Sequence, residues 1–575
     1  MARHYAERLF QRHEDLRTLL FQEGHKVGLM IEANRKHGDR LYHLIETLKT
    51  QSPFDHPVER FDLLETHISY ILLTGPYAYK FKKPLDLGFL DFTTLEKRKF
   101  YCEEELRLNR RLAPALYLTV VPITGTESSP HVGGSGPAID YCVKMVQFSA
   151  DAELDRVLER GQLSTRHIDD LAAQIAHFHQ QSAVAGADSI FGTPAEVSKF
   201  ALENFDQIPL DTVDPEIRQR LAFLRGWTVE QLEKLEPVLS KRKRDGWIRN
   251  CHGDMHLTNM ALIDDRIVVF DCIEFNESLY WIDVINEIAF LLMDLDDRGR
   301  SDLAHRFLNR YLERTGDYAG LGLLDLYRVY RSLVRAKVAQ IQYRQLRPEA
   351  RERQACQQRF MRHLALADRY TNKPAPVPLI ITYGFSGSGK TWLTDKLIDL
   401  TGAIRLRSDI ERKRLAGLGA EARTDSCIGA DLYQPAMTDY TYERLRALAR
   451  KVLASGFPVI VDAAFLKYRQ RDAFSQLAAT LGAPFYILHL QAREATLRER
   501  IRQRRMAGED ASEATLAVLD YQLRANEPLT DAECERTVQI ETEGAHPKLN
   551  ELAEQLLFQA APKPDPDPSA PASPS

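Results

Sequence analysis

The spacing of apolar residues predicts a first region in which helices and strands are mixed. Four apolar residues lie on one helical face near the start of the chain: Leu41, Leu44, Ile45 and Leu48. After that helix the pattern predicts strands, a helix, more strands, and then mostly helices broken by one strand-and-loop cluster. Helices are expected over 1–50, over 95–112 and over most of 151–245, and strands over 60–83 and within 117–148. The strand-and-loop cluster is 247–275, and helices follow it to about 370.

A second region with a different pattern follows a proline-bearing break at 371–378, which predicts a linker. Beyond the break, strand-like and amphipathic segments alternate, as is typical of a parallel sheet with crossover helices. The last residues, 559–575, contain too few apolar side chains to fold and predict a disordered tail. We therefore expect a helical extension over 1–50, a first domain over 51–370 and a second domain over 379–558.

Residues 384–391 read GFSGSGKT and match the nucleotide-binding pattern GxxxxGK[ST]. The glycines let backbone N–H groups turn toward phosphates, and the helix that begins near Lys390 adds the positive end of its dipole. Lys390 is expected on the β- and γ-phosphates of ATP, and the Thr391 hydroxyl on Mg²⁺. The predicted nucleotide-binding residues of this loop are Gly384, Ser386, Gly387, Ser388, Gly389, Lys390 and Thr391.

Three further residues predict chemistry beside this loop. A second apolar strand ends in Asp462, and a carboxylate in that position usually bears on Mg²⁺ or its water shell, with a helix cap as the alternative. Asp409 and Arg412 lie three residues apart at the start of a helix, so both can face one cleft. There Asp409 is expected to accept the proton of an acceptor hydroxyl and Arg412 to hold a phosphate, with a solvent-exposed ion pair as the alternative.

Five arginines precede a glycine-containing loop, at positions 498, 500, 502, 504 and 505. Arg500 and Arg504 share a helical face, where two like charges are unfavourable on their own. A polyphosphate bound beneath a closing lid would offset this repulsion. A solvated basic face is the alternative interpretation.

Over about 378–545 the sequence resembles the small P-loop kinases of the gluconate kinase, polynucleotide kinase and zeta-toxin type. Polynucleotide kinases carry an Asp-x-x-Arg pair whose aspartate is the base, so the resemblance implies that role for Asp409. It leaves open whether the acceptor is a sugar, a nucleoside or a nucleic-acid end.

In the first region, the segment 250–275 carries His252, Asp254 and Asn259 on a loop and delivers Asp271 at the end of a strand. A phosphoryl transferase needs a carboxylate near the acceptor hydroxyl, and an amide oxygen and a second carboxylate for metal ions. The segment supplies these groups at short spacing. A polar β-hairpin without function is the alternative.

This segment resembles the HGDxxxxN loop and the following strand-end aspartate of the aminoglycoside phosphotransferase and choline kinase group. The resemblance extends over about 60–345 and implies a protein-kinase-like α+β domain with two lobes, about 51–148 and 149–370. By resemblance, Asp254 is the catalytic base and Asn259 and Asp271 hold Mg²⁺.

The same resemblance implies three positions for ATP. Lys80 stands on a strand in the place of the phosphate-binding lysine, and Lys82 points the same way by strand alternation. Glu105 on the next helix would be the partner of Lys80, and backbone groups near Val146 would meet adenine. The turn at 65–69, ETHIS, departs from the group because it contains no glycine.

A stripe of Arg328, Arg331 and Arg335 along one helical face gives a hypothesis about the acceptor. The stripe would recognise an anionic acceptor rather than a cationic aminoglycoside. Ion pairing with the acidic segment 294–297 is an equally good alternative.

Composition adds limits. A hydrophobic content of 44% and a charged content of 27% are typical of globular proteins, and the net charge of -5 gives no general attraction to nucleic acid or to an anionic membrane. The arginine cluster nevertheless leaves a nucleic-acid acceptor open for the C-terminal half. No signal peptide, membrane-length apolar run or CxxC pair is present in the sequence, so we expect a cytoplasmic protein without a membrane partner.

Two such modules in one chain resemble a bacterial fusion family that pairs an aminoglycoside-phosphotransferase-like domain with a P-loop kinase or ATPase domain. The expected fold is multidomain, with an α+β protein-kinase-like first domain and an α/β P-loop NTPase with a parallel sheet. We expect a bifunctional enzyme in which each half uses ATP and Mg²⁺ to phosphorylate a small hydroxyl-bearing molecule. The alternative is that one half is a non-catalytic nucleotide-binding regulator of the other.

Overall fold

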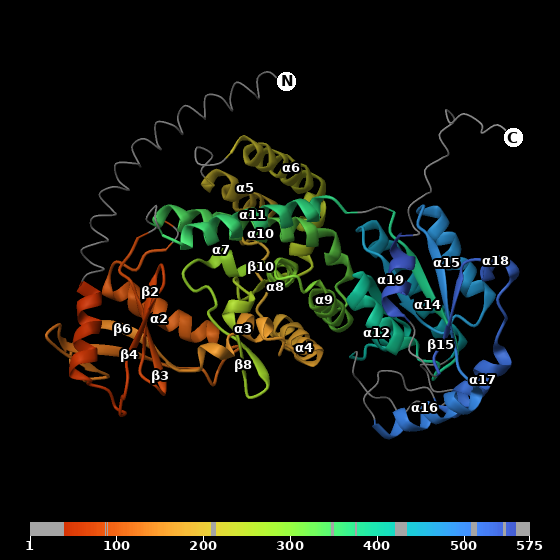
Figure 1. The fold of residues 1–575 in the computed structure, drawn as a ribbon, viewed down its shortest axis with the longest axis horizontal. Helices are drawn as coiled ribbons and strands as arrows, with labels where there is room; N and C mark the ends of the chain where they lie inside the picture. Colours follow the sequence, from red (N-terminus) through yellow and green to blue (C-terminus); the bar gives the residue numbers. More distant parts are fainter. Residues whose placement is uncertain are drawn as a thin grey trace, which may run out of the picture. The chain divides into compact units, whose positions relative to one another are not determined.

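The computed structural model describes most of the chain, and the described residues form two compact units (Figure 1). Unit 1 comprises Met1–Gln162 and Asn250–Ile282, and unit 2 comprises Leu163–Arg249 and Asp283–Ser575. The described residues are 40–86, 88, 90–208, 214–346, 350–373, 376–419, 434–507, 515–543 and 548–558.

Two predicted segments lie wholly or partly outside the described residues. The helical extension expected over 1–50 is described from residue 40, and residues 40–51 are helical. The tail predicted at 559–575 lies outside. Among the described residues, no helix has the length and apolar character needed to cross a membrane.

Unit 1 is built on a six-stranded antiparallel sheet with the strand order β1-β2-β3-β6-β4-β5. Gly75 has a φ of +96°, which lets the chain turn tightly between β2 and β3. The strands are β1 (Asp62–Glu65), β2 (Ser69–Leu73), β3 (Tyr77–Lys82), β4 (Tyr117–Thr126), β5 (Ser129–Val132) and β6 (Ala138–Val146).

Each face of this sheet is covered by a helix. The four apolar residues predicted on one helical face within 1–50 are buried against Leu72 and Phe81 of the sheet. On the opposite face, α2 (Leu95–Asn109) buries Cys102 against Ala78 and Val143. The alternation of side chains along β3 therefore supplies both hydrophobic layers.

Shorter elements complete unit 1 and carry the loop that the sequence singled out. A β8–β9 hairpin follows this loop, and β7 pairs with β10. The elements are η1 (Ala150–Ala152), α3 (Leu154–Glu159), η3 (Leu257–Asn259), β8 (Met260–Ile263), β9 (Arg266–Val269) and α7 (Glu277–Tyr280), and the bounds of the units fall within β7 (Ile248–Asn250) and β10 (Trp281–Asp283).

Unit 2 begins with a helical layer around one hydrophobic core. Phe290 of α8, Leu333 of α10 and Phe360 of α11 meet in this core. The helices are α4 (Thr165–Gln181), α5 (Pro194–Gln207), α6 (Pro215–Arg244), α8 (Val284–Asp297), α9 (Ser301–Thr315), α10 (Leu321–Gln345) and α11 (Glu352–Thr371), with a short η4 (Tyr318–Gly320).

The remainder of unit 2 is the predicted parallel sheet, in the order β12-β13-β11-β14-β15. Helices α12 and α19 pack on one face, and α14 and α15 on the other. The elements are β11 (Leu379–Tyr383), α12 (Lys390–Thr401), β12 (Ile404–Arg407), α13 (Ser408–Leu415), α14 (Pro435–Ala454), β13 (Val459–Asp462), α15 (Tyr468–Thr480), β14 (Phe485–Gln491), α16 (Glu494–Ala507), α17 (Leu516–Ala525), α18 (Asp531–Cys534), β15 (Thr537–Glu541) and α19 (Leu549–Phe558).

The outer edge of β12 is covered by α9. The side-chain amide of Asn309 donates to the carbonyl oxygen of Ala403 (3.0 Å), and its Oδ1 accepts from the N–H of Arg405 (2.7 Å). Asn309 thus satisfies two backbone groups of an edge strand that would otherwise need another strand or water.

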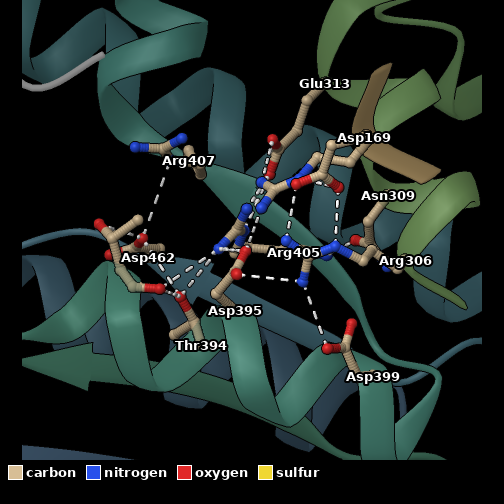
Figure 2. A network of polar contacts seen from close by, with 12 residues as sticks. Asp169, Arg306, Asn309, Glu313, Thr394, Asp395, Asp399, Arg405, Arg407 and Asp462 are labelled. Carbon is tan, nitrogen blue, oxygen red and sulfur yellow. Dashed lines mark hydrogen bonds and ion pairs between the residues drawn. The ribbon is translucent and has the colours of Figure 1, made fainter. Parts of the chain in front are cut away.

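Besides its contact with β12, α9 is joined to α12 by ion pairs (Figure 2). Arg306 makes a bidentate pair with Asp169 of α4, with both N···O distances 2.7 Å, and lies 3.3 Å from Asp399. Arg310 binds Asp395 at 2.5 Å. The helical layer and the parallel sheet are therefore joined by several charge-assisted hydrogen bonds.

We expect Ile45→Ala to destabilise unit 1, because Ile45 is fully buried between the first described helix and the sheet. The loss of a buried isoleucine to alanine costs about 2–5 kcal/mol in free energy of unfolding. Urea unfolding of the full chain measures the effect, with the exposed Thr50→Ala as control. Equal unfolding midpoints for the two variants would contradict the packing described.

Asp399 predicts a pH dependence of stability in unit 2. Burial, followed by the neighbouring charge of Asp395, raises the pKa of Asp399 to about 6, although Arg306 and Lys396 oppose the shift. Because the pKa of Asp399 in the folded chain lies above the ordinary value of 3.8, folding favours its protonated form. The stability that this form contributes is complete below about pH 4 and is lost as the pH rises through 6.

We therefore expect Asp399→Asn to lose less stability than the parent chain between pH 4 and pH 7. Urea unfolding at each pH measures the difference, and the exposed Asp170→Asn on α4 is the control. Parallel stability curves for parent and Asp399→Asn would refute the assignment.

Candidate active sites

In unit 1, backbone hydrogen bonds fix the loop 252–259 against residues 270–273. His252 Nε2 lies 2.8 Å from the carbonyl oxygen of Phe270, and the N–H of Ile273 donates to the carbonyl of His252 (3.1 Å). The N–H of Phe270 donates to the carbonyl of Asn259 (3.0 Å). These bonds bring the predicted loop residues next to the strand end that carries Asp271.

Asp254 and Asn259 are in direct contact. The Asn259 side-chain amide donates to both Oδ2 and the carbonyl oxygen of Asp254, each at 2.9 Å. With its NH₂ group used in this way, Asn259 has its amide oxygen left as the acceptor that a cation requires.

Asp271 adopts an unusual backbone conformation, with a φ of +64°. A non-glycine residue in the left-handed region costs free energy and is concentrated at functional sites. Its side chain is 43% exposed, and its Oδ1 lies 2.5 Å from Lys80 Nζ. The structure therefore brings the predicted lysine and the predicted metal-binding carboxylate together.

Lys80 and Lys82 share the same buried carboxylate. Glu105, which is fully buried, lies 2.8 Å from Lys80 and 2.7 Å from Lys82, and Lys82 also binds the buried Glu274. Strand alternation had placed both lysines on one side of β3. Glu274 was not among the predicted residues, because its partner Lys82 lies 192 positions away in the chain.

The pKa values of this cluster follow from burial and opposite charge. Burial opposes the charge of Lys80, but Asp271 and Glu105 outweigh it and hold the pKa of Lys80 well above its usual range. Burial likewise opposes ionisation of Glu105, and the two lysines reverse the effect and lower its pKa. For Glu274 burial dominates and raises the pKa.

Two other parts of the predicted ATP site are already engaged within unit 1. The N–H of Val146 donates to Leu116 O (2.9 Å), so any contact with adenine would have to use a different backbone group. In the turn at 65–69, the hydroxyl of Thr66 accepts from the N–H of Ser69 (2.9 Å). This turn is therefore closed by its own hydrogen bonds.

In unit 2, the P-loop borders a cavity of about 620 Å³. Residues predicted from four separate sequence segments line it: Ser386, Gly387, Gly389, Lys390, Thr391, Asp409, Arg412, Asp462, Arg500 and Arg504. Gly384 and Ser388 shape the loop itself, because a Cβ at Gly384 would lie 2.8 Å from both Leu490 O and Ser388 Oγ.

The loop holds Lys390 and Thr391 in defined positions. Lys390 Nζ donates to the carbonyl oxygens of Gly384 (2.9 Å) and Phe385 (2.7 Å). The Thr391 hydroxyl donates to Asp462 Oδ2 at 3.0 Å. Asp462 is thus tied to the P-loop threonine, which is the arrangement that a shared Mg²⁺ ion needs.

Asp409 and Arg412 both face the cavity, as predicted from their spacing, and they are paired at 3.0 Å. Both side chains are partly buried, with 25% and 11% exposure, so they form an ion pair that lines the cavity. The positive charge of Arg412 stands beside the carboxylate that the sequence identified as the candidate base.

The arginine cluster divides into two groups. Arg500 reaches the P-loop, where it donates to the carbonyl of Gly387 (3.2 Å), and Arg504 lines the cavity. Arg498 and Arg502 instead pair with carboxylates near the surface. The side chain of Arg505 lies outside the described residues.

The hypothesis of an anion-binding arginine stripe on α10 is wrong for Arg328 and Arg331, because both are buried. Arg331 donates to Asn286 Oδ1 (2.9 Å) and lies over the ring of Phe290. Arg328 lies over the ring of Tyr370; burial opposes ionisation of Asp296, but the charge of Arg328 is among the influences that lower its pKa. These guanidinium groups belong to the core.

Comparisons with known proteins match each half separately. The sequence profile of the Phosphotransferase enzyme family matches residues 100–324, and a profile described as AAA domain matches residues 379–529. The chain is also 30% identical over 476 residues to the uncharacterized proteins Rv2004c of Mycobacterium tuberculosis and Mb2027c of Mycobacterium bovis. Those alignments cover 81% of this chain and 91% of each mycobacterial protein.

Two solved structures illustrate more distant similarity. A choline/ethanolamine kinase family protein from Mesorhizobium loti is 13% identical, with a TM-score of 0.35, and the match covers 59% of this chain and 96% of that one. A gluconokinase from Sinorhizobium meliloti 1021 is 23% identical, with a TM-score of 0.21, and the match covers 32% of this chain and 90% of that one.

The lysine cluster of unit 1 gives a test that is independent of activity. We expect Lys82→Met to cost about 3–5 kcal/mol in free energy of unfolding, since it leaves the buried Glu274 without its paired lysine. Chemical denaturation measures this cost. Lys99→Met is the control, because Lys99 is half exposed and lies 3.9 Å from Glu103, a pair worth at most about 1 kcal/mol. Similar losses in both variants would show that the buried cluster does not stabilise unit 1.

Proposed function

Since the chain belongs to one family with these mycobacterial proteins and joins a phosphotransferase-family domain to a P-loop AAA domain, it is a phosphotransferase, and we propose that both halves transfer phosphate. Each half would use ATP and Mg²⁺ to phosphorylate a small hydroxyl-bearing molecule. One observation supports the proposal: each unit holds its own candidate phosphate-binding lysine in one site with a candidate metal carboxylate and a candidate base.

In the first half, Lys80 would bind phosphate oxygens of ATP, and Glu105 would keep its ammonium group in place. Asn259 and Asp271 would hold Mg²⁺, an assignment supported by the amide oxygen of Asn259 and by the half-exposed carboxylate of Asp271. Asp254 would accept the proton of the attacking hydroxyl.

In the second half, the backbone N–H groups of the P-loop and Lys390 would surround the phosphates, while Arg500 and Arg504 would add positive charge from α16. Thr391 and Asp462 would hold Mg²⁺, and the 3.0 Å contact between them supports a shared ion. When bound at either site, Mg²⁺ would neutralise negative charge on the phosphates during transfer.

Asp409 would be the base of the second half, with Arg412 beside the incoming group. The acceptor hydroxyl would lose its proton to Asp409 as its oxygen attacks the γ-phosphorus, and the bond between that phosphorus and the bridging oxygen of ADP would break. Proximity and charge neutralisation would supply most of the acceleration.

The cavity of unit 2 favours a small acceptor over a nucleic-acid end. Its volume of about 620 Å³ is in the range of pockets that enclose small molecules, and both charge signs line it. The competing proposal is that one half binds nucleotide without turnover and regulates the other.

A three-variant comparison tests these alternatives. Phosphoryl transfer to a panel of small hydroxyl compounds, and ATP hydrolysis, are measured for the parent chain, Asp254→Ala, Lys390→Ala and the double variant. We expect each single change to lower phosphoryl transfer to the acceptor of the same half by at least about a hundredfold, because each deletes a group proposed to contact the reactants directly. Asp264→Asn and Lys451→Ala, both exposed, are the matched controls.

The pattern of losses separates the hypotheses. Independent losses toward two different acceptors support two catalytic sites. Loss of every activity from either single change supports an enzyme with a nucleotide-binding regulator. Unchanged activity in Lys390→Ala would refute phosphoryl transfer by the P-loop half.

A further inference from the structure

A continuous chain of polar contacts runs from α9 into the P-loop site (Figure 2). It begins at Glu313, which lies in the segment matched by the phosphotransferase profile, and it ends at Asp462, the candidate metal ligand of the AAA segment. The link between them is Arg405, on the edge strand β12.

Arg405 is completely buried, so its charge depends on protein partners. Its Nε donates to Glu313 Oε1 (2.8 Å), and its NH1 lies 3.2 Å from Asp395 Oδ1. Burial opposes ionisation of Glu313, but Arg405, with Arg407 and Arg310, lowers its pKa. Removing one member of such a pair would leave an uncompensated charge inside the protein.

The same guanidinium group borders the first turn of the P-loop helix. Arg405 NH1 lies 3.4 Å from the carbonyl oxygen of Thr391 and 3.4 Å from the hydroxyl of Thr394. The hydroxyl of Thr394 lies 3.4 Å from Asp462 Oδ2, the oxygen that also accepts from Thr391. Arg405 therefore stands directly behind the two groups assigned to Mg²⁺.

We propose that Glu313 and Arg405 are positioning residues for the P-loop site, so that α9 of the phosphotransferase segment completes the nucleotide site of the AAA segment. Glu313 fixes the guanidinium group of Arg405, and Arg405 fixes the first turn of α12, where Thr391 meets Asp462. The inference rests on the proposed function of this site, because it concerns the geometry of its metal ligands.

This role differs from that of the other ion pairs on the same helix. Arg306 pairs with Asp395 (3.2 Å) and also with Asp399 at the far end of α12, about two turns beyond Thr391. In the described contacts Asp399 reaches neither Thr394 nor Asp462. Loss of the Arg306–Asp399 pair would perturb the same interface without moving the metal ligands. Asp399→Asn is therefore a matched control.

The experiment uses the full-length chain and measures binding of a fluorescent ATP analogue over a range of Mg²⁺ concentrations. Binding that persists in Lys390→Ala is subtracted, which leaves the part that depends on the P-loop. The variants are Glu313→Gln, the apolar pair Glu313→Leu with Arg405→Met, and Asp399→Asn. Unfolding midpoints are recorded for each, because a buried ion pair replaced by apolar residues of similar size keeps most of its stability.

We expect Glu313→Gln and the apolar pair to raise the Mg²⁺ concentration for half-maximal binding by about tenfold, the usual effect of losing a group that orients a metal ligand. Binding without Mg²⁺ should stay within about twofold, and Asp399→Asn should match the parent chain. The apolar pair decides between the two roles. If Glu313 and Arg405 only stabilised the fold, this variant would regain the Mg²⁺ dependence of the parent chain together with its unfolding midpoint.

The inference is overturned if the apolar pair has the Mg²⁺ dependence of the parent chain, or if Asp399→Asn shifts that dependence as much as Glu313→Gln does. Both outcomes leave the proposed function intact, since the parent chain still binds nucleotide through Lys390. If the parent chain and Lys390→Ala bind the ATP analogue equally, the P-loop part of the proposed function is overturned, and this inference with it.

Discussion

The buried pair of Arg405 and Glu313 is the contact on which the arrangement of unit 2 depends. An arginine with no exposed surface on an edge strand requires a carboxylate from another element, and here α9 supplies it. Asn309 on the same helix satisfies the backbone of β12, so the edge of the sheet has a side-chain partner in place of a further strand. The helical layer and the parallel sheet therefore form one compact unit, although a proline-bearing break separates them in sequence.

Charge compensation also governs the two candidate sites, but the partners differ. Carboxylates hold Lys80, whereas backbone carbonyl oxygens hold Lys390. A phosphate that approached Lys80 would compete with these two carboxylates. In the first site a cation on Asp271 would draw that carboxylate away from Lys80, so metal and phosphate binding should be coupled there.

Sequence patterns predicted the features that depend on local spacing. The P-loop and the alternation of strands and helices follow from neighbouring residues, and strand alternation placed Lys80 and Lys82 on one side of β3. Two buried contacts between distant segments were not predicted: Glu313 and Arg405 are 92 positions apart, and Glu274 meets Lys82 across 192. Arg328 and Arg331 lie along one helical face, yet both are buried: Arg328 lies over the ring of Tyr370, and Arg331 donates to Asn286.

The contact between α9 and β12 gives the union of the phosphotransferase segment and the AAA segment in one chain a physical meaning. A sheet cut away from α9 would leave Arg405 without Glu313 and would open the edge of β12 to water or to another strand. A helical layer cut away from the sheet would take Arg405 from Glu313 and the backbone of Ala403 and Arg405 from Asn309. Because each part satisfies buried polar groups of the other, the P-loop segment depends on the helical layer for its own interior.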